Sequence, residues 1–206
     1  MKVEHFLCGA VGTNCYLAYS EESRKGFIVD PGGSNRQLLD RVKAENIEVE
    51  AILLTHGHGD HIGGLDACRE AFPKALLVAC AGEREMLEDS RKNFSREICG
   101  RDLSYEADRY VEDGDTMETG GMKLQFLATP GHTPGGMCIL AGDVLFSGDT
   151  LFAQSVGRTD FPGSSWEELL SSIREKLFLL PDDTQVLPGH MGPTTIGTEK
   201  RHNPFV

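Results

Sequence analysis

Residues 55–61 read Thr-His-Gly-His-Gly-Asp-His, and this run constrains the fold and the chemistry of the chain more than any other segment. It follows an apolar stretch at 51–55 that predicts a buried strand, and a helix is expected to start near His61. Three imidazoles and a carboxylate within six residues cannot all be packed in an apolar core. Gly57 and Gly59 supply the backbone freedom that lets such a loop fold around a ligand. Because divalent zinc is bound by neutral His nitrogen and carboxylate oxygen, the run predicts a metal site.

Three more candidate ligands lie in separate loops. His132 lies within the run Thr-Pro-Gly-His-Thr-Pro-Gly, Asp149 follows a strand expected at 144–147, and His190 follows a strand expected at 185–187. Candidate ligands at several strand ends are typical of a site built from loops at one end of a sheet scaffold.

Asp30 is a further carboxylate at a strand end, since it follows an apolar run at 26–29 and precedes Pro-Gly-Gly. It could orient a ligand histidine or cap a turn, and both interpretations stay open. His5 and His202 lie in no comparable setting and are treated as ordinary surface or packing residues.

The rest of the chain alternates short apolar runs with turn signals. These runs predict strands at 2–7, 15–19, 26–29, 51–55, 75–79, 122–128, 137–141, 144–147 and 185–187. Helical spacing predicts helices near 34–45 (capped by Ser34), 62–72, 83–89 and 165–177. Residues 82–112 are the least regular part, and are either a surface insertion over a site or a solvated helix and loop. The order of elements favours two sheets packed face to face with helices outside.

Length and charge exclude several classes of function. The 206 residues fit one ordinary domain. Since 32 acidic and 20 basic residues give a net charge of −12, we expect neither nucleic acid nor an anionic membrane as partner. No secretory signal is seen and the six cysteines form no C-x-x-C pair, which predicts a reduced, cytoplasmic protein. The sequence leaves the oligomeric state open.

The candidate ligands resemble those of the metallo-β-lactamase superfamily in motif and in strand-end context, over nearly the whole chain: His56, His58, Asp60, His61, His132, Asp149 and His190. The resemblance implies an α/β fold, a four-layer αββα sandwich, as a single domain over 1–206 with the metals at one edge of the sheets. It implies two divalent ions, of which zinc is expected and iron or manganese is open. One ion is then held by His56, His58 and His132, and the other by Asp60, His61 and His190. Asp149 bridges the two.

Two stretches are similar to the glyoxalase II (hydroxyacylglutathione hydrolase) group in its short bacterial form: 148–161 and 188–205. This implies cleavage of a small thioester such as S-lactoylglutathione by a metal-bridging hydroxide, with Asp60 and Asp149 as catalytic carboxylates. The separate C-terminal domain with which longer members hold glutathione is not expected. Arg158 lies where those members place a basic residue for the glutathione carboxylate, so it either binds substrate or forms a structural ion pair.

Two other functions remain open. The first is that of a persulfide dioxygenase-like enzyme with one iron, whose relatives share the Gly-Arg-Thr-Asp-Phe run and use only positions equivalent to His56, His132 and Asp149. The remaining ligand types are present but largely unused in such enzymes, so the motif does not exclude this function. The second is a catalytically silent binding protein, although such proteins usually lose ligands. In the hydrolase interpretation, the two divalent ions carry four positive charges, and Asp60, Asp149 and a bridging hydroxide carry three negative ones. The metal centre then keeps a net charge of about +1. We therefore expect an anionic small-molecule substrate despite the acidic chain.

Overall fold

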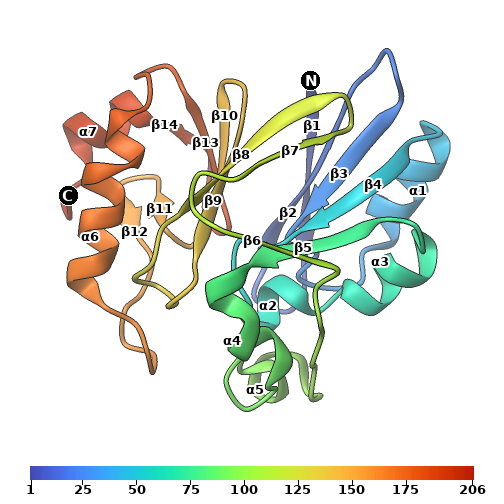
Figure 1. Cartoon of the computed structure of the whole chain (residues 1–206), viewed down its shortest axis with the longest axis horizontal. Coiled ribbons are helices and arrows are strands. Elements are labelled where there is room, and N and C mark those ends of the chain that lie inside the picture. The colour runs from blue at the N-terminus through green and yellow to red at the C-terminus, as the bar shows by residue number, and fades with distance from the viewer.

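The computed structural model describes residues 1–206 and contains two six-stranded sheets packed face to face with helices on both outer faces (Figure 1). The predicted four-layer αββα architecture is therefore confirmed. The N-terminal half, blue to green in Figure 1, forms one sheet and its helices, and the C-terminal half, yellow to red, forms the other. No helix is both long enough and apolar enough to span a lipid bilayer.

The N-terminal sheet has the order β1-β2-β3-β4-β5-β6, with antiparallel pairing from β1 to β3 and parallel pairing from β3 to β6. Its strands are β1 (Lys2–Cys8), β2 (Thr13–Tyr19), β3 (Lys25–Val29), β4 (Glu48–Leu53), β5 (Leu76–Cys80) and β6 (Arg109–Val111). The helices of this half are α1 (Arg36–Ala44), α2 (Gly59–Ile62), α3 (Leu65–Ala71), α4 (Arg84–Glu88) and α5 (Ser95–Cys99). A 3₁₀ turn at Ala81–Glu83 leads from β5 into α4.

The C-terminal sheet has the order β14-β13-β10-β9-β8-β7. Its strands are β7 (Thr116–Thr119), β8 (Met122–Ala128), β9 (Met137–Ala141), β10 (Val144–Gly148), β13 (Gln185–Pro188) and β14 (Thr194–Thr195). A two-stranded sheet, β11 (Leu151–Phe152) and β12 (Ser155–Val156), follows β10. Helices α6 (Trp166–Glu175) and α7 (Ile196–His202) belong to this half, with a 3₁₀ turn at Leu177–Leu179.

The core consists of three apolar layers, which explains why central strands such as β3 and β10 read as continuous apolar runs. On β3, Phe27 belongs to the layer between the sheets, whereas Ile28 belongs to the layer shared with α1 and α3. On the other side, Leu145 of β10 packs in a third layer with Leu169 and Ile173 of α6. Since the central strands of both sheets are covered on both faces, functional groups are expected at the ends of these strands.

The edge that carries the candidate ligands also joins the two ends of the chain. Asn14 of β2 donates its backbone N–H to the carbonyl of Gly189 at 2.7 Å and its side-chain amide to the carbonyl of Pro188 at 2.8 Å. The Tyr16 hydroxyl also donates to the Pro188 carbonyl, at 2.7 Å. These bonds fix the loop after β13 against the opening hairpin.

Two local predictions are corrected by the structure. The first helix is capped by Asn35, whose side chain accepts from the Leu38 N–H at 3.1 Å, and not by Ser34. The helix predicted over 62–72 is divided into α2 and α3, because Gly63 and Gly64 pack against the backbone of residues 31–33.

Residues 82–112 are more ordered than the sequence indicated. They contain α4, close to the helix predicted at 83–89, and also α5 and the edge strand β6. Short elements elsewhere, namely β7, β11, β12, β14 and α7, were likewise not predicted.

Candidate metal centre

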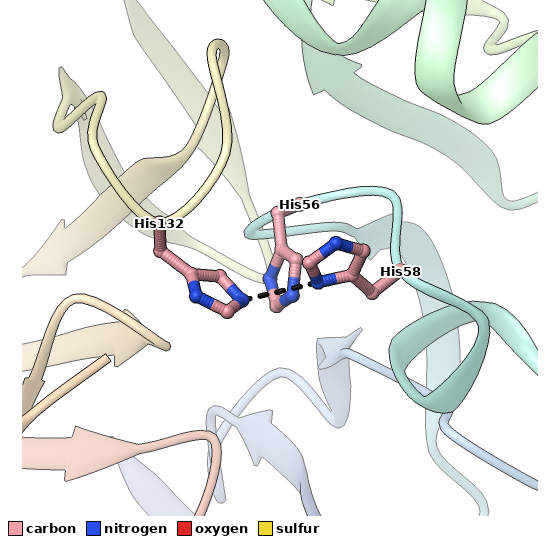
Figure 2. Close-up of side chains that lie close together, drawn as sticks. All are labelled: His56, His58 and His132. Atoms are coloured by element: carbon pink, nitrogen blue, oxygen red, sulfur yellow. Dashed lines mark hydrogen bonds between the residues drawn. The ribbon is translucent and has the colours of Figure 1, made fainter. Parts of the chain in front are cut away.

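All seven predicted ligand residues converge at one edge of the sandwich. Their ligand atoms form three groups in which all atoms lie within 4.8 Å of one another: His56, His58 and His132; His56, His61 and Asp149; Asp60, His61 and His190. Figure 2 shows the first group, in which His56 and His58 come from the loop after β4 and His132 comes from the loop after β8. The Nδ1 atom of His58 lies 3.0 Å from Nε2 of His132.

The two aspartates occupy different places in the cluster. Asp149 Oδ1 lies 3.4 Å from His61 Nε2, and Asp149 Oδ2 lies 3.6 Å from Nε2 of both His132 and His190. Asp149 therefore faces nitrogen atoms of the first and the third group together. Asp60 Oδ2 lies 3.2 Å from His190 Nε2 and 3.7 Å from His61 Nε2, the two histidines of the third group.

Unpartnered buried atoms indicate that this cluster fits a metal. Six buried side-chain polar atoms of the chain have no hydrogen-bond partner, and four of them belong to the cluster: His56 Nε2, His58 Nε2, His61 Nε2 and Asp149 Oδ1. An unsatisfied buried polar atom costs about 1–3 kcal/mol, so four in one place are expected only where a ligand pairs with them. Imidazole nitrogen and carboxylate oxygen suit zinc, iron or manganese.

Burial and charge set the protonation of these groups. Burial lowers the pKa of His56 well below its usual value and that of His58 to about 3, so both are neutral and have a free lone pair. Burial alone would raise the pKa of Asp149, but the neighbouring His61 holds it below its usual value. Burial alone would lower the pKa of His61, but the carboxylates of Asp149, Asp30 and Asp60 raise it.

The Asp30 carboxylate fixes the loop that carries the candidate ligands, through Thr55 and His61. Its Oδ1 accepts the Thr55 N–H at 2.8 Å, and its Oδ2 accepts the Thr55 hydroxyl at 2.6 Å and lies 2.9 Å from His61 Nδ1. Both open interpretations of Asp30 thus apply, because one carboxylate fixes the turn and directs His61 Nε2 toward the cluster. His132 is fixed in a similar way, with Nδ1 at 2.7 Å from the carbonyl oxygen of Arg158.

Glu83 is a site residue that the sequence did not reveal. Its carboxylate is buried at 1% exposure, accepts the Gly57 N–H at 2.7 Å through Oε2, and accepts the Gly135 N–H at 2.8 Å through Oε1. It therefore joins the loop of His56 and His58 to the loop of His132. The one available signal is that Glu83 follows Gly82 just after an apolar strand, as the ligands do.

A cavity of about 450 Å³ opens onto the cluster and is lined by His58, Asp60, His132 and His190. Arg158 also lines it, with an exposed guanidinium that pairs with Asp160 at 2.9 and 2.7 Å and lies 4.7 Å from the ring centre of Phe161. The sequence left two roles open for Arg158, substrate binding and a structural ion pair, and the position of Arg158 permits both.

The layered fold and this His/Asp cluster together define the class of the protein, a hydrolase-like metalloprotein with a site suited to two ions. The family model of the metallo-beta-lactamase superfamily matches residues 8–190, so the chain belongs to that superfamily. It is 34% identical, over 100% of its own length and 98% of the relative's, to hydroxyacylglutathione hydrolase GloC of Haemophilus influenzae.

Solved structures give the same fold. The B3 metallo-beta-lactamase BLEG-1 matches with a TM-score of 0.92 and 39% identity over 99% of both chains. TTHA1623 in a di-iron-bound form matches with a TM-score of 0.85 and 33% identity, over 98% of this chain and 100% of that one. ETHE1 from Myxococcus xanthus matches with a TM-score of 0.77 and 30% identity, over 99% of this chain and 84% of that one.

Proposed function

We propose that the chain is a metal-dependent hydrolase of small anionic thioesters such as S-lactoylglutathione. The observation that carries the proposal is the complete cluster, in which Asp149 faces both outer groups of candidate ligands. An enzyme with one iron would need only His56, His132 and Asp149. The convergence of Asp60, His61 and His190 on a further group favours a two-metal hydrolase.

Two divalent ions, when bound, lower the pKa of a shared water toward ~7 and polarise a carbonyl oxygen. In our proposal His56, His58 and His132 would hold one ion, Asp60, His61 and His190 would hold the other, and Asp149 lies where it could serve both. Asp60 also lines the cavity, so its carboxylate can accept a hydrogen bond from the attacking water and orient it. A leaving thiol has a pKa of only ~8.5, so the site needs no strong general acid.

The surroundings of the site support an anionic small molecule as substrate. Arg158 lines the cavity and can exchange Asp160 for a substrate carboxylate, because ion pairs in water are weak. We further propose a cytoplasmic location, which agrees with the six cysteines being in no disulfide. Nucleic acid and membranes are not expected as partners of a chain with a net charge of −12.

The test combines metal analysis, thioester cleavage and oxygen uptake on one sample of purified protein. We expect two ions per chain and hydrolysis of S-lactoylglutathione that stops when a chelator removes the metal. Asp149→Asn should abolish the reaction, while the exposed Asp40→Asn should leave it intact. Rapid cleavage of a β-lactam without thioester cleavage would contradict the proposed substrate.

A persulfide dioxygenase with one iron is the alternative, which the run Gly-Arg-Thr-Asp-Phe at 157–161 and the likeness to ETHE1 leave open. One iron per chain, with oxygen uptake on glutathione persulfide and no thioester cleavage, would establish it in place of the hydrolase.

A further inference from the structure

A second and larger cavity, of about 710 Å³, adjoins the one over the metal cluster. Its walls include Arg84, Arg91, Lys92, Phe94, Pro134 and Pro162. Phe94 lines both cavities, and Phe161 of the first cavity directly precedes Pro162 of the second. The two spaces therefore share the Phe94 side chain as a wall, with Phe161 beside it.

These two aromatic rings stand beside the metal ligands. Their centres lie 5.4 Å apart, and the ring of His58 lies 5.7 Å from Phe94 and 5.1 Å from Phe161. Because the two rings are in contact, they form one wall beside the candidate ligands, and a thioester whose carbonyl lies at the cluster would reach the second cavity past Phe94.

The backbone holds Phe94 in an unusual conformation. Its φ is +56°, a region that residues with side chains rarely adopt. The preceding Asn93 is buried, donates its amide to the Leu103 carbonyl at 2.8 Å, and accepts the Gly59 N–H through its backbone oxygen at 2.6 Å. The backbone of Asn93 therefore ties Phe94 to the loop that carries His56, His58 and Asp60. Residues with a strained backbone of this kind concentrate at binding sites.

The second cavity is basic within an acidic protein. Arg84, Arg91 and Lys92 line it, against Glu85 as the one acidic lining residue, although the chain as a whole has a net charge of −12. Arg84 is held by Glu88 at 3.2 Å and by stacking over Tyr110.

Arg91 and Lys92 are the more available charges. Arg91 pairs with Asp89 at 2.7 Å with its side chain 88% exposed, and Lys92 pairs with Glu85 at 2.6 Å with its side chain half exposed. Pairs that are this exposed are screened by water and salt, so both cations can exchange their partners for an arriving carboxylate.

We propose that the second cavity binds the anionic thiol-carrier half of the substrate, a peptide-sized thiol with free carboxylates, through Arg91 and Lys92. This inference rests on the proposed thioester hydrolysis. It assigns the recognition of the thiol carrier to the second cavity. The volume lies within the ~300–1,000 Å³ of small-molecule sites. Pro134 and Pro162 give the cavity a stiff wall.

Binding of S-methylglutathione, a thioether that cannot be hydrolysed, tests the subsite without turnover. Calorimetry on the metal-loaded protein should give a Kd about tenfold or more higher for Arg91→Ala/Lys92→Ala than for the unchanged chain. The matched control Arg36→Ala/Lys43→Ala removes the same two charges from α1 and should shift the Kd less than about twofold. Equal Kd values for both variants, or no binding by the unchanged chain, would overturn the subsite.

Kinetics separate this inference from the proposed function. The ratio of kcat/KM for S-lactoylglutathione to kcat/KM for the uncharged S-lactoyl-N-acetylcysteamine should fall about tenfold in Arg91→Ala/Lys92→Ala and stay constant in the control. An unchanged ratio overturns the subsite while leaving thioester hydrolysis in place. If neither thioester is cleaved, the proposed function fails, and the thioether measurement still decides whether the cavity binds the carrier.

Discussion

The N-terminal sheet supplies four candidate ligands from one loop, whereas the C-terminal sheet supplies three from three separate strand ends. The first set lies within six residues, 56–61, and includes the short helix α2. The second set, His132, Asp149 and His190, follows β8, β10 and β13 and spans nearly 60 residues. The first set can be brought together by local backbone geometry, but the second requires the C-terminal sheet to be paired in register. We infer that the C-terminal set makes the site sensitive to the packing of the two sheets.

Asp149→Ala should have the largest effect, because this carboxylate faces candidate ligands from both sheets. We expect a loss of kcat on the order of 10³-fold, since several kcal/mol of transition-state stabilisation go with a metal ion. The metal content should fall from two ions toward one per chain by mass spectrometry. A variant with two ions and full activity would disprove the bridging position.

Asp30→Asn tests only the candidate ligands of the N-terminal sheet, residues 56–61. Asn tolerates the left-handed conformation at this position, where φ is +49°, but it replaces a charged acceptor of His61 and Thr55 by a neutral one. Loss of such a supporting carboxylate typically lowers metal affinity by about 10–100-fold. A competition assay with a chelating dye measures this, with the exposed Asp40→Asn as control. An unchanged affinity would mean that Asp30 only caps the turn.

Glu83→Gln tests the connection between the two ligand loops. Gln offers one carbonyl oxygen where the carboxylate accepts both Gly57 and Gly135, so one buried N–H loses its partner. We expect the free energy of unfolding to fall by about 1–3 kcal/mol in urea titrations of the metal-free protein. The exposed Glu70→Gln is the control. A loss confined to activity, with stability unchanged, would contradict the connecting role.

Arg158→Ala should have the smallest effect, because its guanidinium is exposed and paired with Asp160. If Arg158 contacts the substrate, KM for S-lactoylglutathione should rise roughly two- to fivefold at low salt, and the rise should shrink as salt screens the charge. Asp160→Ala, which frees the guanidinium, should leave KM equal or lower. A rise in KM for the uncharged thioester as well would assign Arg158 a structural role.

The contrast between local and long-range contacts also explains which features could be predicted from the sequence. The seven candidate ligand positions are recognisable because strand ends, Gly and Pro mark them locally, and the αββα layers follow from the order of apolar runs. The division of α2 from α3 was not visible, because Gly63 and Gly64 are required by contacts with residues 31–33. Glu83 was missed for the same reason, since its partners lie 26 and 52 residues away along the chain.

The hydrogen bonds from Asn14 and Tyr16 to Pro188 join residues 174 and 172 positions apart in the chain. During synthesis on the ribosome, the loop of the first four ligands emerges early, but the strand that faces the opening hairpin is made more than a hundred residues later. Contacts of such long sequence separation form slowly. The nascent chain can therefore offer a metal ion only a partial set of ligands. We expect tight metal uptake to be a late event, after β13 has docked beside β2.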